Sequence, residues 1–333
     1  MYNFYVFIIT LFFSLFLTIL ITKKIIPVLA KNKMGQRILA DGPNWHKEKE
    51  GTPTMGGVSF VLATIACFFI FCIFLKSDTK EIVILLNVLA YSILNALIGI
   101  IDDFAKIRNR RNEGLSAKSK FFLQSIAAIL FLISLRITVN INTELYIPFV
   151  NVKYDIGIFY YILAYFLLCG FVNAVNLTDG LDGLASSVVL SIGLFFAFVS
   201  LSLINNAVLS FISAVLIGGT IGFLRFNLHP AKIFMGDTGS LFLGSMVVSI
   251  SFVINNILLV LVYGFVFLCE ALSDILQVVY FKITNGKRIF KMAPIHHHFK
   301  LCGWSETKIA FVFYIITAMM CLVAFLGATF IFG

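Results

Sequence analysis

Five aspartates in this 333-residue sequence have the types and spacing for chemistry on phosphates. Asp102 and Asp103 are adjacent, Asp179 and Asp182 lie three positions apart, and Asp237 stands alone, each beside a long apolar run. Carboxylates that converge need cations, because two unit charges about 4 Å apart interact by about 4 kcal/mol at an effective dielectric constant of about 20. Mg²⁺ suits such a site, since it prefers oxygen ligands and takes its other ligands from water and substrate phosphates. The pattern therefore indicates metal-assisted phosphoryl chemistry.

The segment 171–183 holds more polar residues than a connector between two apolar runs needs. It carries Asn173, Asn176, Asp179 and Asp182, with glycines at positions 180 and 183. Ionisable residues at membrane depth are costly and usually functional. We interpret the segment as the floor of a polar site, and in a helix its two aspartates would share a face.

Another polar connector between two apolar runs carries three histidines. His296, His297 and His298 are consecutive, whereas zinc bound on one helix would need histidines at i and i+4. We therefore favour binding of a phosphate or a sugar by this triplet over a zinc site. The six cysteines form no Cys-x-x-Cys pair, so no disulfide framework is indicated either.

Each charged group also has a structural explanation that the sequence leaves open. Asp237 precedes an apolar run and could cap a helix. Asp102 and Asp103 could form a solvated helix end, although the C-terminal end of a helix disfavours anions. Lys47 and Lys49 could mark only the cytoplasmic side of a membrane, or a lysine here could fold back over an anionic ligand.

The composition is that of a membrane protein. Hydrophobic residues make up 60% of the chain, charged residues make up 12%, and the mean hydropathy is +1.01. Soluble domains carry about 25% charged residues, and barrel strands would show alternating polarity, which these apolar runs lack. The sequence predicts an all-α polytopic membrane protein with one domain over residues 1–333, without a soluble domain or an internal repeat.

Ten apolar runs are long enough to approach the roughly 20 residues that span a bilayer. No basic residue precedes the first run and Lys23 and Lys24 follow it, so we expect an anchor rather than a signal peptide. The predicted transmembrane helices cover residues 3–26, 55–75, 82–101, 119–138, 158–175, 183–203, 207–225, 238–256, 258–282 and 308–331.

The distribution of basic residues predicts the orientation. With Met1 outside, only Lys76, Lys80, Arg136 and Lys153 of the 25 Lys and Arg residues fall in outer segments. Basic residues favour the cytoplasmic side. We therefore expect both termini outside and five loops in the cytoplasm, with nearly all candidate site residues among those loops.

One outer segment has the pattern of a small β-hairpin. Residues 139–157 alternate polar and apolar side chains on either side of Pro148, which is typical of two short strands.

Five motifs together resemble one family. They are Lys49–Gly57 (KEGTPTMGG), Ile101–Asp103 (IDD), Asn176–Gly183 (NLTDGLDG), Phe234–Ser240 (FMGDTGS) and Ala293–Phe299 (APIHHHF). In this order and over essentially the whole chain, they resemble bacterial phospho-N-acetylmuramoyl-pentapeptide transferases. The acidic motifs alone would fit the wider superfamily of polyprenyl-phosphate N-acetylhexosamine-1-phosphate transferases. The TPTMGG and histidine motifs point to the muramoyl branch.

The resemblance implies a fold, a location and a reaction. It implies ten helices, a homodimer and a cytoplasmic active-site cleft in the inner membrane of a bacterium. It implies transfer of phospho-MurNAc-pentapeptide from UDP-MurNAc-pentapeptide to undecaprenyl phosphate, with Mg²⁺ as cofactor, UMP and lipid I as products, and no nucleic-acid partner.

The resemblance also implies roles for individual residues. Asp237 is the expected metal ligand, and Asp102 and Asp103 flank the phosphates, with Asp102 as the proposed base. The expected nucleotide site is lined by Asn176, Asp179, Gly180, Asp182 and Asn227, with Phe234 against the uracil. The residues expected to contact polar or anionic parts of the substrate are Lys49, Lys106, Lys118, His296 and His297.

One position departs from the family pattern, and two other functions compete with the expected one. Lys300 follows the histidine motif where we expect Glu, and we assign it no function. A sister enzyme would transfer GlcNAc-1-phosphate to the same lipid, and the histidine triplet argues against it. A transporter would need acids strung across the bilayer, and only Glu270 and Asp274 are candidates for its outer half.

Overall fold

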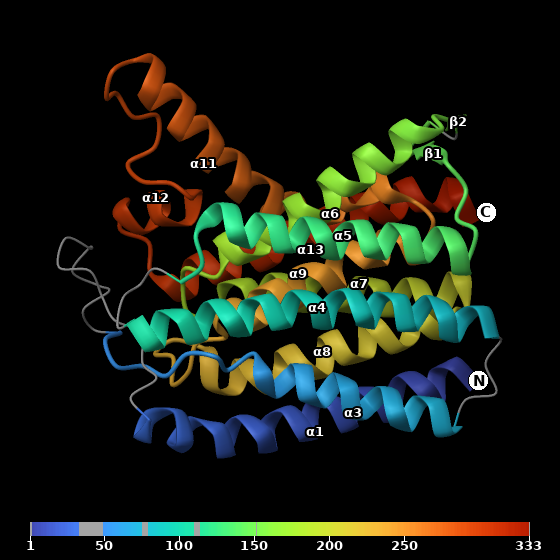
Figure 1. The fold of residues 1–333 in the computed structure, drawn as a ribbon, viewed down its shortest axis with the longest axis horizontal. Coiled ribbons are helices and arrows are strands. Elements are labelled where there is room, and N and C mark those ends of the chain that lie inside the picture. Colours follow the sequence, from blue (N-terminus) through green and yellow to red (C-terminus); the bar gives the residue numbers. More distant parts are fainter. Residues whose placement is uncertain (1, 33–48, 75–78, 110–113, 151, 333) are drawn as a thin grey trace.

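The computed structural model describes residues 2–32, 49–74, 79–109, 114–150 and 152–332. Long helices run side by side in one bundle (Figure 1). Their bounds are α1 (Tyr2–Lys31), α3 (Val58–Phe74), α4 (Thr79–Asn109), α5 (Ala117–Thr138), α6 (Ile158–Thr178), α7 (Leu184–Val199), α8 (Ala207–Asn227), α9 (Gly236–Val253), α10 (Val260–Tyr263), α11 (Phe265–Ile283), α12 (Ile295–Leu301) and α13 (Glu306–Phe332).

Two helices form the centre of the bundle and the others surround them. In the most apolar stretch of each helix, 94% of the residues are buried in α8 and 78% in α9, but only 22% are buried in α1. Small residues allow close helix contacts. A Cβ added at Gly99 of α4 would overlap the backbone of Asp237 and Thr238 at the start of α9. This close approach brings the acids of α4 beside those of α9.

All ten predicted spans contain helix, which confirms an all-α polytopic fold. Among the described residues, eight helices are long and apolar enough to cross a membrane, and Val58–Cys72 of α3 is a shorter apolar helix. The short joins between the predicted spans, near residues 204–206 and 256–257, are breaks between helices. Asn206 caps α8 by accepting a hydrogen bond from the Leu209 N–H, and Asn256 accepts one from the Leu259 N–H.

The prediction of one continuous helix over 258–282 is wrong. The chain bends by 83° between α10 and α11. At the bend, a Cβ on Gly264 would collide with the Phe171 ring, so a glycine is required where α6 packs against the corner. Beyond the bend, α11 leaves the bundle (Figure 1) and exposes apolar residues such as Leu272 and Ile275.

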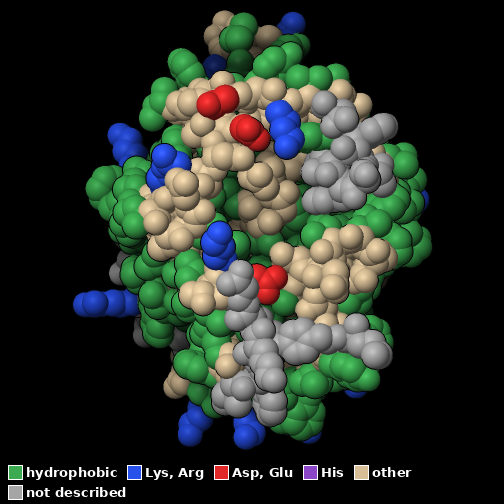
Figure 2. All heavy atoms as spheres, turned by 90° about the vertical axis from the view of Figure 1, so that its right-hand side faces the viewer, with side chains coloured by type: hydrophobic (Ala, Val, Ile, Leu, Met, Phe, Trp, Pro, Cys, Tyr) green, Lys and Arg blue, Asp and Glu red, His purple; other side chains and the backbone are tan. Residues whose placement is uncertain are grey.

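The predicted hairpin is present between α5 and α6. Strands β1 (Glu144–Ile147) and β2 (Val152–Asp155) pair antiparallel, with Glu144 opposite Asp155 and Ile147 opposite Val152. The hairpin lies at the end of the bundle that also carries both termini (Figure 1). Figure 2 shows this end, where charged side chains are sparse and no histidine is visible. The candidate site residues lie at the opposite end.

Candidate active site

Asp102 and Asp103 lie inside a helix rather than at its end. The structure extends α4 to Asn109, beyond the predicted limit at residue 101. Both aspartates are only 2% exposed, so the interpretation as a solvated helix terminus is wrong. Carboxylates buried to this degree need partners. These partners are Lys106 of α4, the Leu115 N–H in the loop before α5, and the start of α9.

Asp103 caps α9, so the carboxylate of Asp237 is not needed as a cap and is available to other groups of the site. The Asp103 carboxylate accepts hydrogen bonds from the Asp237 N–H at 3.1 Å, the Thr238 N–H at 3.0 Å and the Thr238 hydroxyl at 2.8 Å. An anion at a helix N-terminus is favourable. Asp237 is the second residue of the helix and the N-cap position is Met235, which excludes the alternative explanation of Asp237 as a capping residue.

Two lysine ammonium groups lie among these three carboxylates. Lys106 Nζ is 2.6 Å from Asp102 Oδ2 and 3.1 Å from Asp237 Oδ2. Lys120 Nζ is 2.6 Å from the same oxygen of Asp237. One oxygen from each of the three carboxylates lies within 4.8 Å of the others. This set of converging hard oxygen donors fits a Mg²⁺ ion.

Lys120, and not Lys118, contacts the acids in the described part of the chain. Lys118 is exposed, whereas Lys120 bonds both Asp237 Oδ2 and, at 3.0 Å, Asn176 Oδ1. Residues two apart on a helix point to different faces. The sequence held one signal for Lys120, which is the polar residue Gln124 four positions later on the same helix face. In the structure Gln124 is buried against α6.

The segment 171–183 supplies both a site residue and a structural residue. Asn176, in the last turn of α6, donates to Asp237 Oδ1 at 3.1 Å and to the Ser240 hydroxyl at 2.7 Å. Asn173 instead donates to Gln124 Oε1 and to the Cys169 carbonyl, both at 2.8 Å. Asn173 therefore joins α6 to α5, and the structure does not place it with the acids.

Asp179 and Asp182 do not share a helical face, because α6 ends before them. Asp179 follows the last residue of α6, and Gly183 has a left-handed φ of 71° before α7 begins. Burial, together with the carboxylates of Asp237 and Asp103, raises the pKa of Asp179 well above its usual range. Asp182 points into a second group of charged residues.

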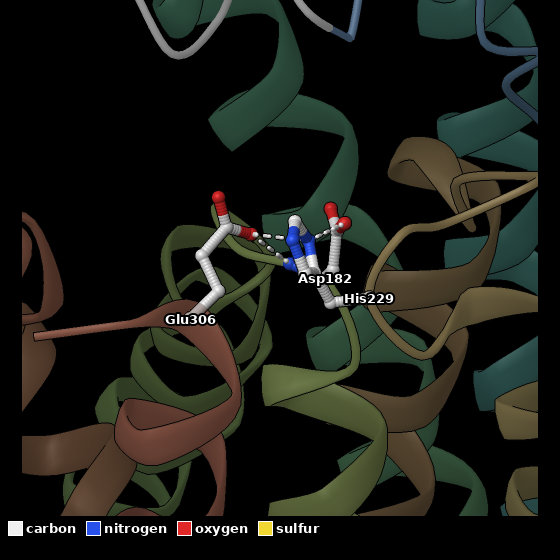
Figure 3. Close-up of side chains that lie close together, drawn as sticks. All are labelled: Asp182, His229 and Glu306. Atoms are coloured by element: carbon white, nitrogen blue, oxygen red, sulfur yellow. Dashed lines mark hydrogen bonds and ion pairs between the residues drawn. The ribbon is translucent and has the colours of Figure 1, made fainter.

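This second group surrounds two buried carboxylates, and Figure 3 shows these two, Asp182 and Glu306, together with His229. Lys49 Nζ lies 2.6 Å from Asp182 Oδ1 and 2.7 Å from Glu306 Oε2. His229 Nδ1 lies 2.8 Å from Asp182 Oδ2. Lys300 Nζ lies 3.2 Å from Glu306 Oε1. Lys300 therefore has a structural partner, and Lys47 lies outside the described residues.

Glu306 is a site residue that sequence reasoning missed. It is 2% exposed, and it also accepts the Asp182 N–H at 3.1 Å. An acid in the first turn of an apolar helix is favourable for electrostatic reasons alone, so its position gave no functional signal. His229, two residues after Asn227 in the sequence, carried only a weak functional signal.

Backbone pairing places the remaining predicted residues. Phe234 exchanges backbone hydrogen bonds with the loop after Lys49, from its N–H to the Pro53 carbonyl and from the Gly56 N–H to its carbonyl, both at 2.8 Å. The Phe234 ring centroid lies 5.7 Å from Lys49 Nζ. The buried Asn227 accepts the Gly183 N–H at 3.1 Å and donates to the Ile233 carbonyl at 2.9 Å. It therefore holds two loops together.

The three histidines point in different directions. His296 on α12 is fully buried beside Gly180. The His297 ring packs on the His296 ring, with centroids 4.1 Å apart. His298 turns toward its own loop, where its Nδ1 accepts the Lys291 N–H at 3.1 Å. The structure thus brings His296 against segment 171–183, at Gly180.

Comparison with known proteins identifies the family. A signature described as phospho-N-acetylmuramoyl-pentapeptide-transferase signature 1 matches residues 49–61. A phospho-N-acetylmuramoyl-pentapeptide-transferase of Clostridium acetobutylicum is 45% identical over 303 residues, covering 91% of this chain and 92% of the relative. The chain belongs to the phospho-N-acetylmuramoyl-pentapeptide transferase family.

Other matches agree with this family. A phospho-N-acetylmuramoyl-pentapeptide-transferase of Staphylococcus carnosus is 41% identical over 302 residues, covering 90% of this chain and 92% of the relative. The family model described as glycosyl transferase family 4 matches residues 82–255. That range contains the acids of α4 and α9 and the segment between α6 and α7, so the match covers the residues that the structure brings together.

Proposed function

We propose that the protein transfers phospho-MurNAc-pentapeptide from UDP-MurNAc-pentapeptide to undecaprenyl phosphate, which forms lipid I and releases UMP. One observation carries the proposal. In a membrane-spanning member of this transferase family, Asp102, Asp103 and Asp237 meet two lysines at one end of the bundle. Such a group suits a reaction in which negative charge moves between phosphates.

Asp237 would hold the metal, with Asp102 and Asp103 beside it. Mg²⁺ at this position would supply neutralisation of the diphosphate and of the departing UMP. Asp103 keeps Asp237 available, because it satisfies the N-terminus of α9 in its place. Asn176 orients the Asp237 carboxylate from the other side through a hydrogen bond of 3.1 Å.

The lysines of the site attract and align the phosphates. Lys106 and Lys120 each contact Asp237 and offer donors to phosphate oxygens. Lys49 is fixed by Asp182 and Glu306 beside Phe234, against which we place the uracil. Asp179, Gly180, Asp182 and Asn227 would form the wall of the nucleotide site.

The lipid phosphate attacks directly, in a single in-line displacement. A phosphate monoester has its second pKa at about 6, so the nucleophile is mostly deprotonated at neutral pH without a protein base. Asp102 is held by Lys106 at 2.6 Å, which supports an electrostatic role rather than proton abstraction. Isolation of a covalent phospho-MurNAc-aspartyl enzyme in the absence of the lipid acceptor would contradict direct displacement.

We place the protein in the bacterial cytoplasmic membrane as a homodimer, with the site on the cytoplasmic face. The donor is soluble and the acceptor is a lipid, so the acceptor has to enter sideways from the inner leaflet. A transporter would need Glu270 in the outer half of the membrane. Glu270 instead pairs with His296 beside Gly180, at the end of the bundle that holds the site, which argues against a transporter.

The test is UMP release by the purified protein. We expect release from UDP-MurNAc-pentapeptide only when undecaprenyl phosphate and Mg²⁺ are both present, with lipid I formed in equal amount. UDP-GlcNAc as donor should give no comparable release. Equal turnover of UDP-GlcNAc would support the sister enzyme, and absence of turnover with either donor would overturn the proposal.

A further inference from the structure

A carboxylate with no place in the proposed reaction is fully buried beside the site. Glu270 of α11 and His296 of α12 are both 0% exposed. Glu270 Oε2 lies 2.8 Å from His296 Nδ1. A pair of this kind adds little stability, since well-packed apolar residues often serve as well. The cost of burying it points to a role in orienting the imidazole.

The partner of Nδ1 determines where the other ring nitrogen points. The Glu270 carboxylate accepts the hydrogen bond, so the proton is on Nδ1. Nε2 faces the opposite way and, within the described residues, has no hydrogen-bond partner. It lies against Gly180, where an added Cβ would collide with it. The absence of a side chain at Gly180 therefore admits the ring to the segment between α6 and α7.

We infer that Glu270 is a positioning residue, which acts on the reaction by holding His296 Nε2 toward segment 179–183. The inference rests on the proposed function, because Nε2 then meets a phosphate or sugar oxygen of the nucleotide-sugar donor. The bend at Gly264 contributes, since it directs α11 out of the bundle and brings Glu270 to α12. Glu270 itself touches no substrate atom.

Asp274 provides a matched control. It lies four residues beyond Glu270 on the same helix, and no hydrogen bond or ion pair involves it in the described part of the chain. Asp274→Asn thus makes the same chemical change as Glu270→Gln without touching the histidine. His296→Asn completes the set, because an asparagine amide can replace Nδ1 toward Glu270 but cannot replace Nε2.

The test measures kcat and KM for UDP-MurNAc-pentapeptide together with Tm for these three variants and the double variant E270Q/H296N. Loss of a carboxylate behind a metal-binding histidine typically costs roughly 10- to 100-fold, and we expect a loss of similar size in kcat/KM for Glu270→Gln. Asp274→Asn should match the wild type. Residues that act through one another are non-additive, so the double variant should be no slower than His296→Asn alone.

Three results would overturn the inference while the proposed function stands. They are wild-type kinetics for Glu270→Gln, losses that multiply in the double variant, and a fall in Tm that accounts for the lost activity of Glu270→Gln. Absence of turnover by the wild-type protein would overturn the proposed function and this inference together.

Discussion

At the scale of single residues, the site depends on different roles for two neighbouring acids, Asp103 and Asp237. Asp103 satisfies the start of α9, and this frees the Asp237 carboxylate for Lys106, Lys120 and Asn176. The motifs in the sequence identified both aspartates, but they could not show which of the two caps the helix. That choice depends on how closely α4 approaches α9, which is a tertiary property.

Lys120 should be required for turnover and Lys118 should not. Hydrogen bonds to charged groups contribute about 1.5–3 kcal/mol, so Lys120→Ala should lower kcat/KM by roughly 10- to 100-fold. Lys118→Ala removes an equal charge from the exposed face of the same helix, and its kcat/KM should stay near the wild-type value. Equal losses in the two variants would mean that general positive charge, rather than the contact with Asp237, matters.

At the scale of elements, close contacts through glycine set the distances in the site. Gly99 lets α4 touch the start of α9, and Gly264 lets α10 and α11 turn a corner at Phe171. The periodicity of the sequence predicted the existence of the helices. It could not predict the 83° bend or the extension of α4 to Asn109, because a glycine or an acid in an apolar run looks the same whether or not another helix packs against it.

Gly99→Ala should damage stability and activity together. Overpacking a tight contact costs about 1–3 kcal/mol, and it should also displace Asp103 from the N-terminus of α9. Gly170→Ala in α6 is the control, because a Cβ there meets nothing within 4 Å and alanine favours helix by roughly 0.5–1 kcal/mol. Thermal unfolding and UMP release of both variants check this. A tolerated Gly99→Ala would show that the contact is not needed.

At the scale of the whole molecule, the candidate site lies at one end of the bundle, and the termini and the hairpin lie at the other. Both termini and the hairpin share one end (Figure 1), whose surface carries few charges (Figure 2). Lysines of the candidate site, such as Lys49, Lys106 and Lys120, lie at the other end, and the positive-inside rule would place that end in the cytoplasm. Sequence reasoning could predict this polarity from charge counts alone, whereas Glu306 and Glu270 needed the folded structure, since their partners are distant in sequence.

Cysteine labelling in intact cells should reveal this orientation. A cysteine at Tyr154, exposed on β2, should react with a membrane-impermeant maleimide from outside. A cysteine at Lys287, beyond the end of α11, should react only after permeabilisation. Both are introduced after replacement of the exposed native Cys72 and Cys302. The reverse pattern would place the candidate site outside the cell.

The most direct measurement is the Mg²⁺ dependence of lipid I formation by wild-type protein and by Asp237→Asn, with Asp274→Asn as the control for loss of one acid. If Asp237 holds the metal, the wild type and the control should require Mg²⁺ equally. Asp237→Asn should lose at least about 100-fold in rate, which corresponds to about 2.7 kcal/mol, and should keep a Tm close to that of the wild type. Wild-type rates for a folded Asp237→Asn protein at the same Mg²⁺ concentration would contradict the account.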